Sequence, residues 1–344
     1  MRDISLSNRR NLLSLSRALG ICKTLLFRYV KEGVLRRHSS ALKPHLKDDN
    51  MKDQLKFCFS MLEESSIPHD PKFKSMHNIV HIDEKWFYIS KKSTNYYLLT
   101  NEDDPYRTCK NKNYIGKVMF LAAVARPRFD NEGNEIFSGK IGVFPLVNNV
   151  PARRSSVNRA AGTLETKPIT SINKEISRMF LINKVLPTIK EKWPRDQAFE
   201  TIYIQQDNVP SHVSIDDEEF RRVASKGGFD IRLTCQPPNS PDLNVLDLGF
   251  FNAIQSLQQM EVTNSVDELI HVVQKSYDTF SSKASNKFFL TLQSCMIEIM
   301  KIKGSNNYKV PHVKKDVMLQ QGRLLVVLQC DGELVHEVME YLAN

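Results

Sequence analysis

Cysteine is scarce in this sequence, and the cysteines present are spread too widely to form a metal or disulfide motif. The 344 residues include six cysteines, and no two form a Cys-x-x-Cys pair. This predicts neither zinc nor a disulfide framework and is typical of a reducing compartment. The N-terminus lacks a signal-peptide stretch, and the longest apolar run, residues 118–125, is far below the roughly 18 residues that span a bilayer. We expect an intracellular, soluble protein with no membrane partner.

Acidic residues are fewer than basic ones, and the difference is concentrated at one end. The formal net charge is +9. Residues 1–56 contain 13 Lys and Arg against 5 Asp and Glu, a net charge of +8, so the rest of the chain contributes +1. A basic excess predicts a polyanionic partner such as nucleic acid. The composition, 41% apolar and 25% charged, excludes wholesale disorder.

Differences in composition and apolar pattern divide the chain into four predicted regions. We expect a small helical region at 1–45, a helical linker at 46–74, an α/β domain at 75–260 and a helical extension at 261–344. The apolar patterns predict strands at 78–89, 117–126, 139–147, 201–206 and 231–234, and helices at 172–192, 216–226, 244–260, 266–280 and 286–301. Two long polar segments, 91–116 and 151–171, are expected to be loops.

The basic N-terminal region has the pattern of a helix-turn-helix. Leu15, Leu19, Ile21 and Leu26 would form its shared core, with Gly20 in the turn. The second helix and the residues after it would present side chains to the grooves of duplex DNA; these are Lys23, Thr24, Arg28, Lys31, Arg36 and Arg37. The alternative is a small helical hairpin with a solvated basic face. The net charge of +8 favours DNA binding.

Three aspartates lie at unusual places in the α/β region. Asp83 interrupts an apolar strand, where a carboxylate is costly unless it is paired or binds a cation; the alternative is a strand edge with surface charges. Asp207 ends the strand 201–206, where Asp-Asn is also common turn chemistry. Asp247 falls on or next to the apolar side of helix 244–260; the alternative is an exposed first-turn acid stabilised by the helix dipole.

Taken together, the three acids predict one kind of chemistry. Carboxylates on two strands and a helix start can hold two Mg²⁺ ions, which prefer oxygen ligands. Two such ions activate an attacking oxygen and stabilise the leaving oxygen in phosphoryl transfer. His212, Trp86, Gln205 and Gln206 are neighbours of these acids in the sequence, and we expect core or turn packing from them.

The three acidic segments resemble the catalytic blocks of mariner-like transposases, members of the DDE superfamily with a ribonuclease-H-like core. The segments are HIDEKWF at 81–87, QDN at 206–208 followed by His212, and NSPDLNVLD at 239–247. Between Asp207 and Asp247 lie 39 residues, and the third acid is Asp, which is similar to the plant-type branch. The similarity runs from about residue 10 to the C-terminus.

This resemblance implies metal-dependent cleavage at transposon ends, followed by attack of the freed 3′-OH on target DNA. Asp83, Asp207 and Asp247 would be the catalytic metal ligands, for two Mg²⁺ or Mn²⁺ ions. Residues 91–116 match the position of the family's clamp loop, which reaches a partner subunit in a homodimer; a solvated loop is the alternative. Its basic residues suit DNA contact and are Lys91, Lys92, Arg107, Lys110 and Lys112. Terminal repeats, target DNA and a nuclear location are implied as well.

One departure from the family pattern concerns the N-terminus. Family members carry two successive helix-turn-helix units, and this chain has room for one, so we expect an N-terminally truncated form. Two explanations stay open: the gene model misses upstream coding sequence, or the protein is a truncated relic. The expected function is a DNA transposase; the alternatives are a catalytically inactive, transposon-derived DNA-binding protein and a nuclease without strand transfer.

Overall fold

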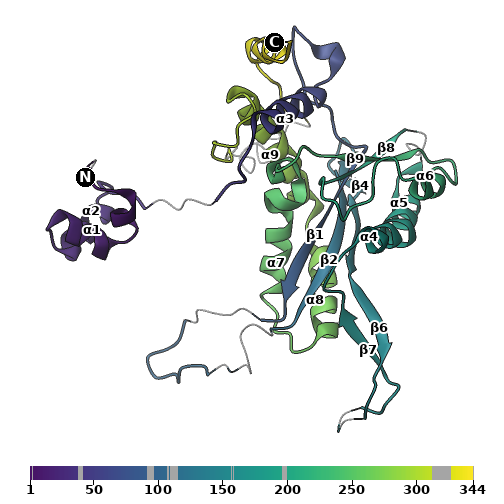
Figure 1. The fold of residues 1–344 in the computed structure, drawn as a ribbon, viewed down its shortest axis with the longest axis horizontal. Helices are drawn as coiled ribbons and strands as arrows, with labels where there is room; N and C mark the ends of the chain where they lie inside the picture. Colours follow the sequence, from purple (N-terminus) through teal and green to yellow (C-terminus); the bar gives the residue numbers. More distant parts are fainter. Residues whose placement is uncertain are drawn as a thin grey trace. The chain divides into compact units, whose positions relative to one another are not determined.

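The computed structural model describes residues 1, 3–37, 42–90, 97–106, 108, 115–155, 157, 159–195, 200–311 and 327–343. Two compact units make up the chain, Met1–Pro44 and His45–Asn344 (Figure 1). Within the described residues, no helix has both the length and the apolar character needed to cross a membrane.

The first unit is a pair of short helices joined by a glycine turn. A 3₁₀ turn, Leu6–Arg9, precedes α1 (Leu12–Leu19) and α2 (Lys23–Lys31). Asn11 caps α1, because its side chain accepts hydrogen bonds from the N–H groups of Leu13 and Ser14. Gly20 ends α1 with a φ of 69°, a left-handed conformation that favours glycine. Of the four predicted core residues, Leu15 and Leu26 are buried between the helices and Leu19 and Ile21 are half-buried, and Gly20 lies in the turn as predicted.

The second unit is organised around a mixed sheet. In the described part of the chain this sheet has five strands in the order β5-β2-β1-β8-β9. The antiparallel pairs are β1–β2 and β2–β5, and the parallel pairs are β1–β8 and β8–β9. The strands are β1 (Ile79–Tyr88), β2 (Lys117–Ala125), β5 (Lys140–Pro145), β8 (Ile202–Gln206) and β9 (Ile231–Cys235). These five strands lie at the five predicted ranges along the chain.

Helices cover both faces of the sheet. On one face lie α4 (Lys174–Phe180), α5 (Leu186–Lys192), the π-helical turn Leu181–Val185 between them, and α6 (Glu218–Ala224). On the other lie α7 (Phe251–Gln258) and α8 (Val266–Thr279). The apolar run 118–125 forms most of β2 and alternates between the two cores: Leu121 and Ala123 pack beneath α4–α6, while Phe120 and Ala122 pack beneath α7 and α8.

A third core joins segments that are far apart in the sequence. It contains side chains from α3 (Asp48–Ser60), α9 (Ser282–Lys301) and α11 (Gly332–Ala343), together with Ile79 at the start of β1. Leu243 and Val245 from the third acidic segment also belong to it. The segment carrying Asp247 is therefore anchored in the same core as α3 and α9.

The prediction of an unstructured polar loop at 151–171 is wrong. Strand β6 (Val147–Pro151) pairs with β7 (Leu164–Pro168) in an antiparallel ribbon, separate from the main sheet. A shorter ribbon, β3 (Arg128–Phe129) with β4 (Glu135–Phe137), was also absent from the predicted elements. Neither ribbon shows apolar alternation long enough to predict a strand, because β3 and β4 are only two and three residues long and β6 and β7 lie largely outside the main core.

Candidate active site

The first acid, Asp83, lies on the central strand. Its partner across the antiparallel pair is Ala122 of β2. Ile82 packs into the core beneath α4–α6, and Phe87 packs into the core beneath α7 and α8. Since side chains alternate along a strand, Asp83 shares the face of Phe87. Because β1 is the middle strand of the sheet, Asp83 does not lie on an edge strand, and that alternative is excluded.

The second acid, Asp207, follows the last residue of β8. Strands β1 and β8 are parallel, and their paired residues run from Ile79 beside Tyr203 to His81 beside Gln205. If the same register is extended by two residues, Asp207 falls level with Asp83. The side chain of Asp207 is 36% exposed. The second acid thus stands at the carboxyl end of its strand, where parallel sheets place their sites.

The third acid, Asp247, lies in a π-helical turn, Leu246–Phe250. Asn244 fixes the start of this turn through its side chain: Nδ2 donates to the carbonyl of Ile82 (3.1 Å), and Oδ1 accepts from the N–H of Leu246 (3.0 Å). Leu246 is buried and Asp247 is exposed, so the acid lies next to the buried side and not on it. Asn244 therefore ties the third acid to β1 one residue before Asp83. Single-turn π-bulges frequently occur at functional sites.

The negative charges of the three acids act on one another. Burial, followed by the charges of Asp247 and Glu84 and more weakly by that of Asp207, raises the pKa of Asp83 from 3.8 to about 8. Partial desolvation also raises the pKa of Asp247, although a hydrogen bond with Asp83 and the charge of Lys85 oppose the rise. A proton is therefore retained at this pair at neutral pH when no cation is present.

The donor chemistry of the triad fits a divalent metal ion. All three side chains offer carboxylate oxygens, the ligands that Mg²⁺ and Mn²⁺ prefer. The charge that raises the pKa of Asp83 is also the charge that a cation would neutralise. Among the described residues, no three His, Cys, Asp or Glu side chains are arranged as they stand to share one ion. Asp83 contacts Asp247, while Asp207 is paired with His212.

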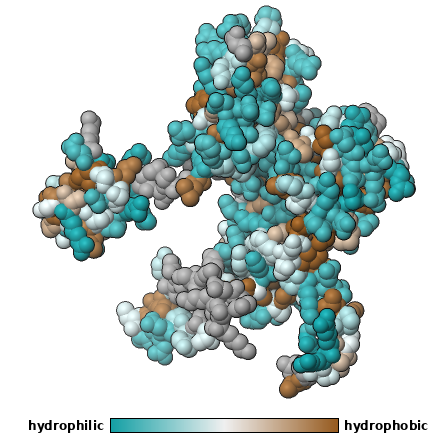
Figure 2. All heavy atoms as spheres, in the orientation of Figure 1, coloured by the Kyte–Doolittle hydropathy of each residue, from teal (hydrophilic) through white to brown (hydrophobic). Residues whose placement is uncertain are grey.

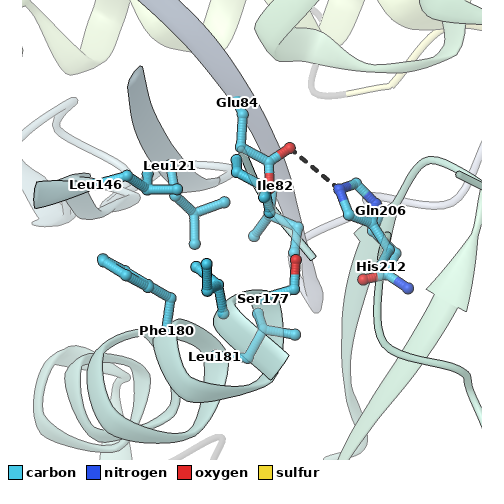
Figure 3. A pocket seen from close by; sticks show the side chains of 11 residues that line it. Ile82, Glu84, Leu121, Leu146, Ser177, Phe180, Leu181, Gln206 and His212 are labelled. Carbon is cyan, nitrogen blue, oxygen red and sulfur yellow. Dashed lines mark hydrogen bonds and ion pairs between the residues drawn. The ribbon is translucent and has the colours of Figure 1, made fainter. Parts of the chain in front are cut away.

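His212 lies between two acids and pairs with both, a contact that the expectation of simple packing did not include. Its Nδ1 lies 2.6 Å from Oδ1 of Asp207, and its Nε2 lies 3.1 Å from Oε2 of Glu84, as the dashed line in Figure 3 shows for the second pair. Burial lowers the pKa of His212, but the contacts with Asp207 and Glu84 outweigh it and raise this pKa to about 10. The imidazolium therefore holds Asp207 against β1.

Two buried glutamines next to Asp207 join β8 to the loops of the site. The amide of Gln205 donates to the carbonyl of Leu243 (2.8 Å) and to the side chain of Gln236 (3.2 Å). The amide of Gln206 donates to the carbonyl of Val213 (2.6 Å). These contacts confirm packing as the function of both residues, and they set the position of the segments before Asp247 and after Asp207.

Replacing Gly249 with Ala is expected to destabilise the turn that carries Asp247. A Cβ at this position would lie 2.4 Å from Cε1 of Phe288, whose ring is stacked on Phe280 and packs against Phe250. We expect a loss of about 1–3 kcal/mol in the free energy of unfolding, measured by denaturant titration. The control Ser256→Ala, on the exposed side of α7, should stay within about 0.5 kcal/mol of wild type. Equal stability of the two variants would show that Phe288 yields without cost.

The predicted DNA-contacting residues of the first unit are exposed. On α2 they are Lys23, Thr24, Arg28 and Lys31, and after it Arg36 and Arg37. All of them lie outside the core made by Leu15 and Leu26. The predicted clamp-loop residues lie outside the described residues; these are Lys91, Lys92, Arg107, Lys110 and Lys112.

Comparisons with known proteins match this chain to solved structures. No protein-family model matches the sequence, and no curated protein matches it. A pre-cleavage Mos1 transpososome superimposes with a TM-score of 0.57 at 16% identity, covering 87% of this chain and 76% of that chain. The Mos1 mariner paired-end complex with Mn gives 0.56 at 17% identity, with coverages of 87% and 76%. The catalytic domain of Mos1 mariner transposase gives 0.50 at 15% identity, covering 78% of this chain and all of that domain.

These matches test the predicted fold. The mixed α/β sheet with helices on both faces is the arrangement of the Mos1 catalytic domain, so the predicted α/β class with a ribonuclease-H-like core is confirmed. The plant-type spacing between Asp207 and Asp247 stays a prediction. This chain therefore has the fold of the Mos1 mariner transposase.

Proposed function

We propose that this chain is a DNA transposase that cuts transposon ends and joins the freed 3′-OH to target DNA. The observation that carries the proposal is the placement of Asp83, Asp207 and Asp247. They come from β1, the end of β8 and the turn Leu246–Phe250, and their mutual charge raises the pKa of Asp83 to about 8. Such a set of carboxylates is costly in a protein without a cation to bind.

In the proposed mechanism Asp83, Asp207 and Asp247 would hold two Mg²⁺ or Mn²⁺ ions. Mos1 structures solved with Mn and with Mg support this choice. When bound, such ions activate the attacking oxygen and stabilise the leaving oxygen of an in-line displacement at phosphorus. Asp83 would lose its proton to solvent when it holds an ion, while His212, paired with Glu84 and Asp207, keeps Asp207 in place. Lys85, which lowers the pKa of Asp247, is suited to a DNA phosphate beside the acids.

The two chemical steps need no external energy source. Water first attacks a phosphodiester and releases a 3′-OH end. That 3′-OH then attacks a phosphodiester of the target, so one P–O bond forms as another breaks. The protein has to position the two DNA segments and neutralise the charge of the phosphate.

The proposed partners are the transposon terminal repeats and target DNA. The exposed basic residues of α2 would bind the repeats, and the neighbouring structures include a paired-end complex with a transposon end and a strand transfer complex. We extend the proposal to a homodimer that pairs two ends, and to a nuclear location, where the target DNA lies.

A cleavage assay on DNA that carries the ends flanking this coding sequence tests the proposal. We expect nicks at the ends with Mg²⁺ or Mn²⁺, none with EDTA, and joining of precut 3′-OH ends to a target plasmid. Salt-sensitive DNA binding without cleavage in any metal would contradict the proposal and favour the inactive DNA-binding alternative. Cleavage without joining would instead indicate a nuclease.

A further inference from the structure

The β6–β7 hairpin is a projecting ribbon that the catalytic site does not account for. It pairs in register from Val147 beside Pro168 to Pro151 beside Leu164. Figure 1 shows it extending beyond the main sheet, and Figure 2 shows largely hydrophilic side chains along it. A two-stranded ribbon is marginally stable by itself, so a ribbon of this length needs support at its root.

The root of the hairpin is firmly attached. The N–H of Leu146 donates to the carbonyl of Met119 (2.8 Å), and the N–H of Ile169 donates to the carbonyl of Leu146 (2.9 Å). Beyond the strands, the N–H of Ala152 donates to the carbonyl of Thr163 (2.8 Å), and the N–H of Gly162 donates back to Ala152 (2.9 Å). The backbone at the outer part of the ribbon is therefore hydrogen-bonded.

The strand register places this root at the catalytic end of the sheet. Asp83 lies beside Ala122, which lies beside Val143 of β5. Two residues further along, Lys85 lies beside Phe120, which lies beside Pro145. The chain leaves β5 at Pro145 and enters the hairpin at Val147. The ribbon thus begins at the level of the sheet just beyond Asp83.

The hairpin carries a local positive charge. Residues 147–168 contain four basic residues and one acid, a net charge of +3. Arg159 and Lys167 both pair with that acid, Glu165. Arg153 and Arg154 are exposed, and no ion pair is found for either among the described residues. Two adjacent guanidinium groups therefore remain available on a part of the chain, residues 57–344, whose net charge is only +1.

We propose that the β6–β7 hairpin is a second DNA-binding element, in which Arg153 and Arg154 contact phosphates of the duplex that enters the catalytic site. This rests on the proposed transposase function. Guanidinium groups match phosphate oxygens in charge and geometry, and the major groove admits a two-stranded ribbon. Contacts to the backbone would fix where the duplex lies without specifying its sequence.

The test compares two double variants in the full chain. Arg153→Ala/Arg154→Ala removes the proposed contacts, and Arg221→Ala/Arg222→Ala removes an adjacent exposed pair from α6 with the same change in charge. Binding to a labelled duplex is measured by fluorescence anisotropy in EDTA, between roughly 50 and 200 mM salt. We expect the hairpin variant to lose about tenfold in affinity and to reduce the slope of log K against log salt by about 2, since each phosphate contact contributes about 0.9. The α6 variant should match wild type.

Two results would overturn the proposal. One is a hairpin variant with the affinity and the salt slope of wild type. The other is an equal loss in both variants, which would mean that total charge alone matters. Unchanged thermal unfolding of both proteins shows that they are folded, and Arg153→Lys/Arg154→Lys should retain most of the slope. Because binding is measured without a metal ion, failure of cleavage would contradict the transposase proposal and leave this one intact.

Discussion

Replacing Asp83 with Asn is expected to lower the rate of metal-dependent DNA cleavage roughly a thousandfold or more. The variant keeps the size of the side chain and can still accept the hydrogen bond from the N–H of Glu84, which is 2.7 Å long in the wild type. It loses the negative charge that a divalent ion requires. The rate is measured on end-bearing DNA in Mg²⁺ and again in Mn²⁺.

Asp267→Asn is the matched control for this change. Asp267 is an exposed acid in the first turn of α8, so its substitution should leave the cleavage rate within about twofold of wild type. DNA binding in EDTA should be the same for Asp83→Asn and for wild type. Cleavage that survives both Asp83→Asn and Asp247→Asn would exclude this triad as the catalytic site.

The same substitution is expected to stabilise the protein when no metal ion is present. The ordinary pKa of 3.8 for Asp83 rises to about 8 in the folded state. Between these two values the folded protein binds more protons than the unfolded chain, so the free energy of unfolding falls as the pH rises, by up to about 1.4 kcal/mol per pH unit. Asp83→Asn removes this loss, and its melting temperature should exceed that of wild type increasingly from about pH 5 to pH 8.

Thermal unfolding at several pH values in EDTA measures the effect. A change of 1 kcal/mol shifts the melting temperature by roughly 2 °C in a protein of this size. Half-buried His77 and buried His81 have lowered pKa values and contribute with the opposite sign, so the difference between variant and wild type is the informative quantity. Saturating Mg²⁺ should raise the melting temperature of wild type and not that of Asp83→Asn. A constant difference at all pH values would contradict the raised pKa.

Much of the fold could be predicted because its signals are local. The apolar run 118–125 predicted a strand, and it became β2, buried on both faces. Gly20 and the leucines around it predicted the turn between α1 and α2. The β6–β7 ribbon could not be predicted, because its pairing joins Val147 to Pro168 across a long intervening segment. Its residues make few apolar contacts, so no alternation marks them as strands.

In the candidate site, too, the features with a local sequence signal could be predicted, and those that depend on distant segments could not. Asp83 and Asp207 could be singled out because an acid in or directly after an apolar strand is costly or functional. His212 could not be assigned beyond packing, since its partner Glu84 lies 128 residues earlier. For Asp247 the sequence left open a place beside the apolar stripe or an exposed place in the first helical turn. Its position depends on the π-helical turn and on the hydrogen bond from Asn244 to Ile82.

The sequence by itself determined which residue types are present, where the strands of the main sheet and most of the helices lie, and that three acids follow the pattern of a metal-dependent phosphoryl-transfer site. Only the tertiary structure decided that Asp83 contacts Asp247 while Asp207 pairs with His212, because these residues come from separate segments of the chain. It also decided that His212 holds Asp207 and that four basic residues share one hairpin. Pairing and burial arise between distant segments, and these non-local contacts set the pKa values and the surface charge.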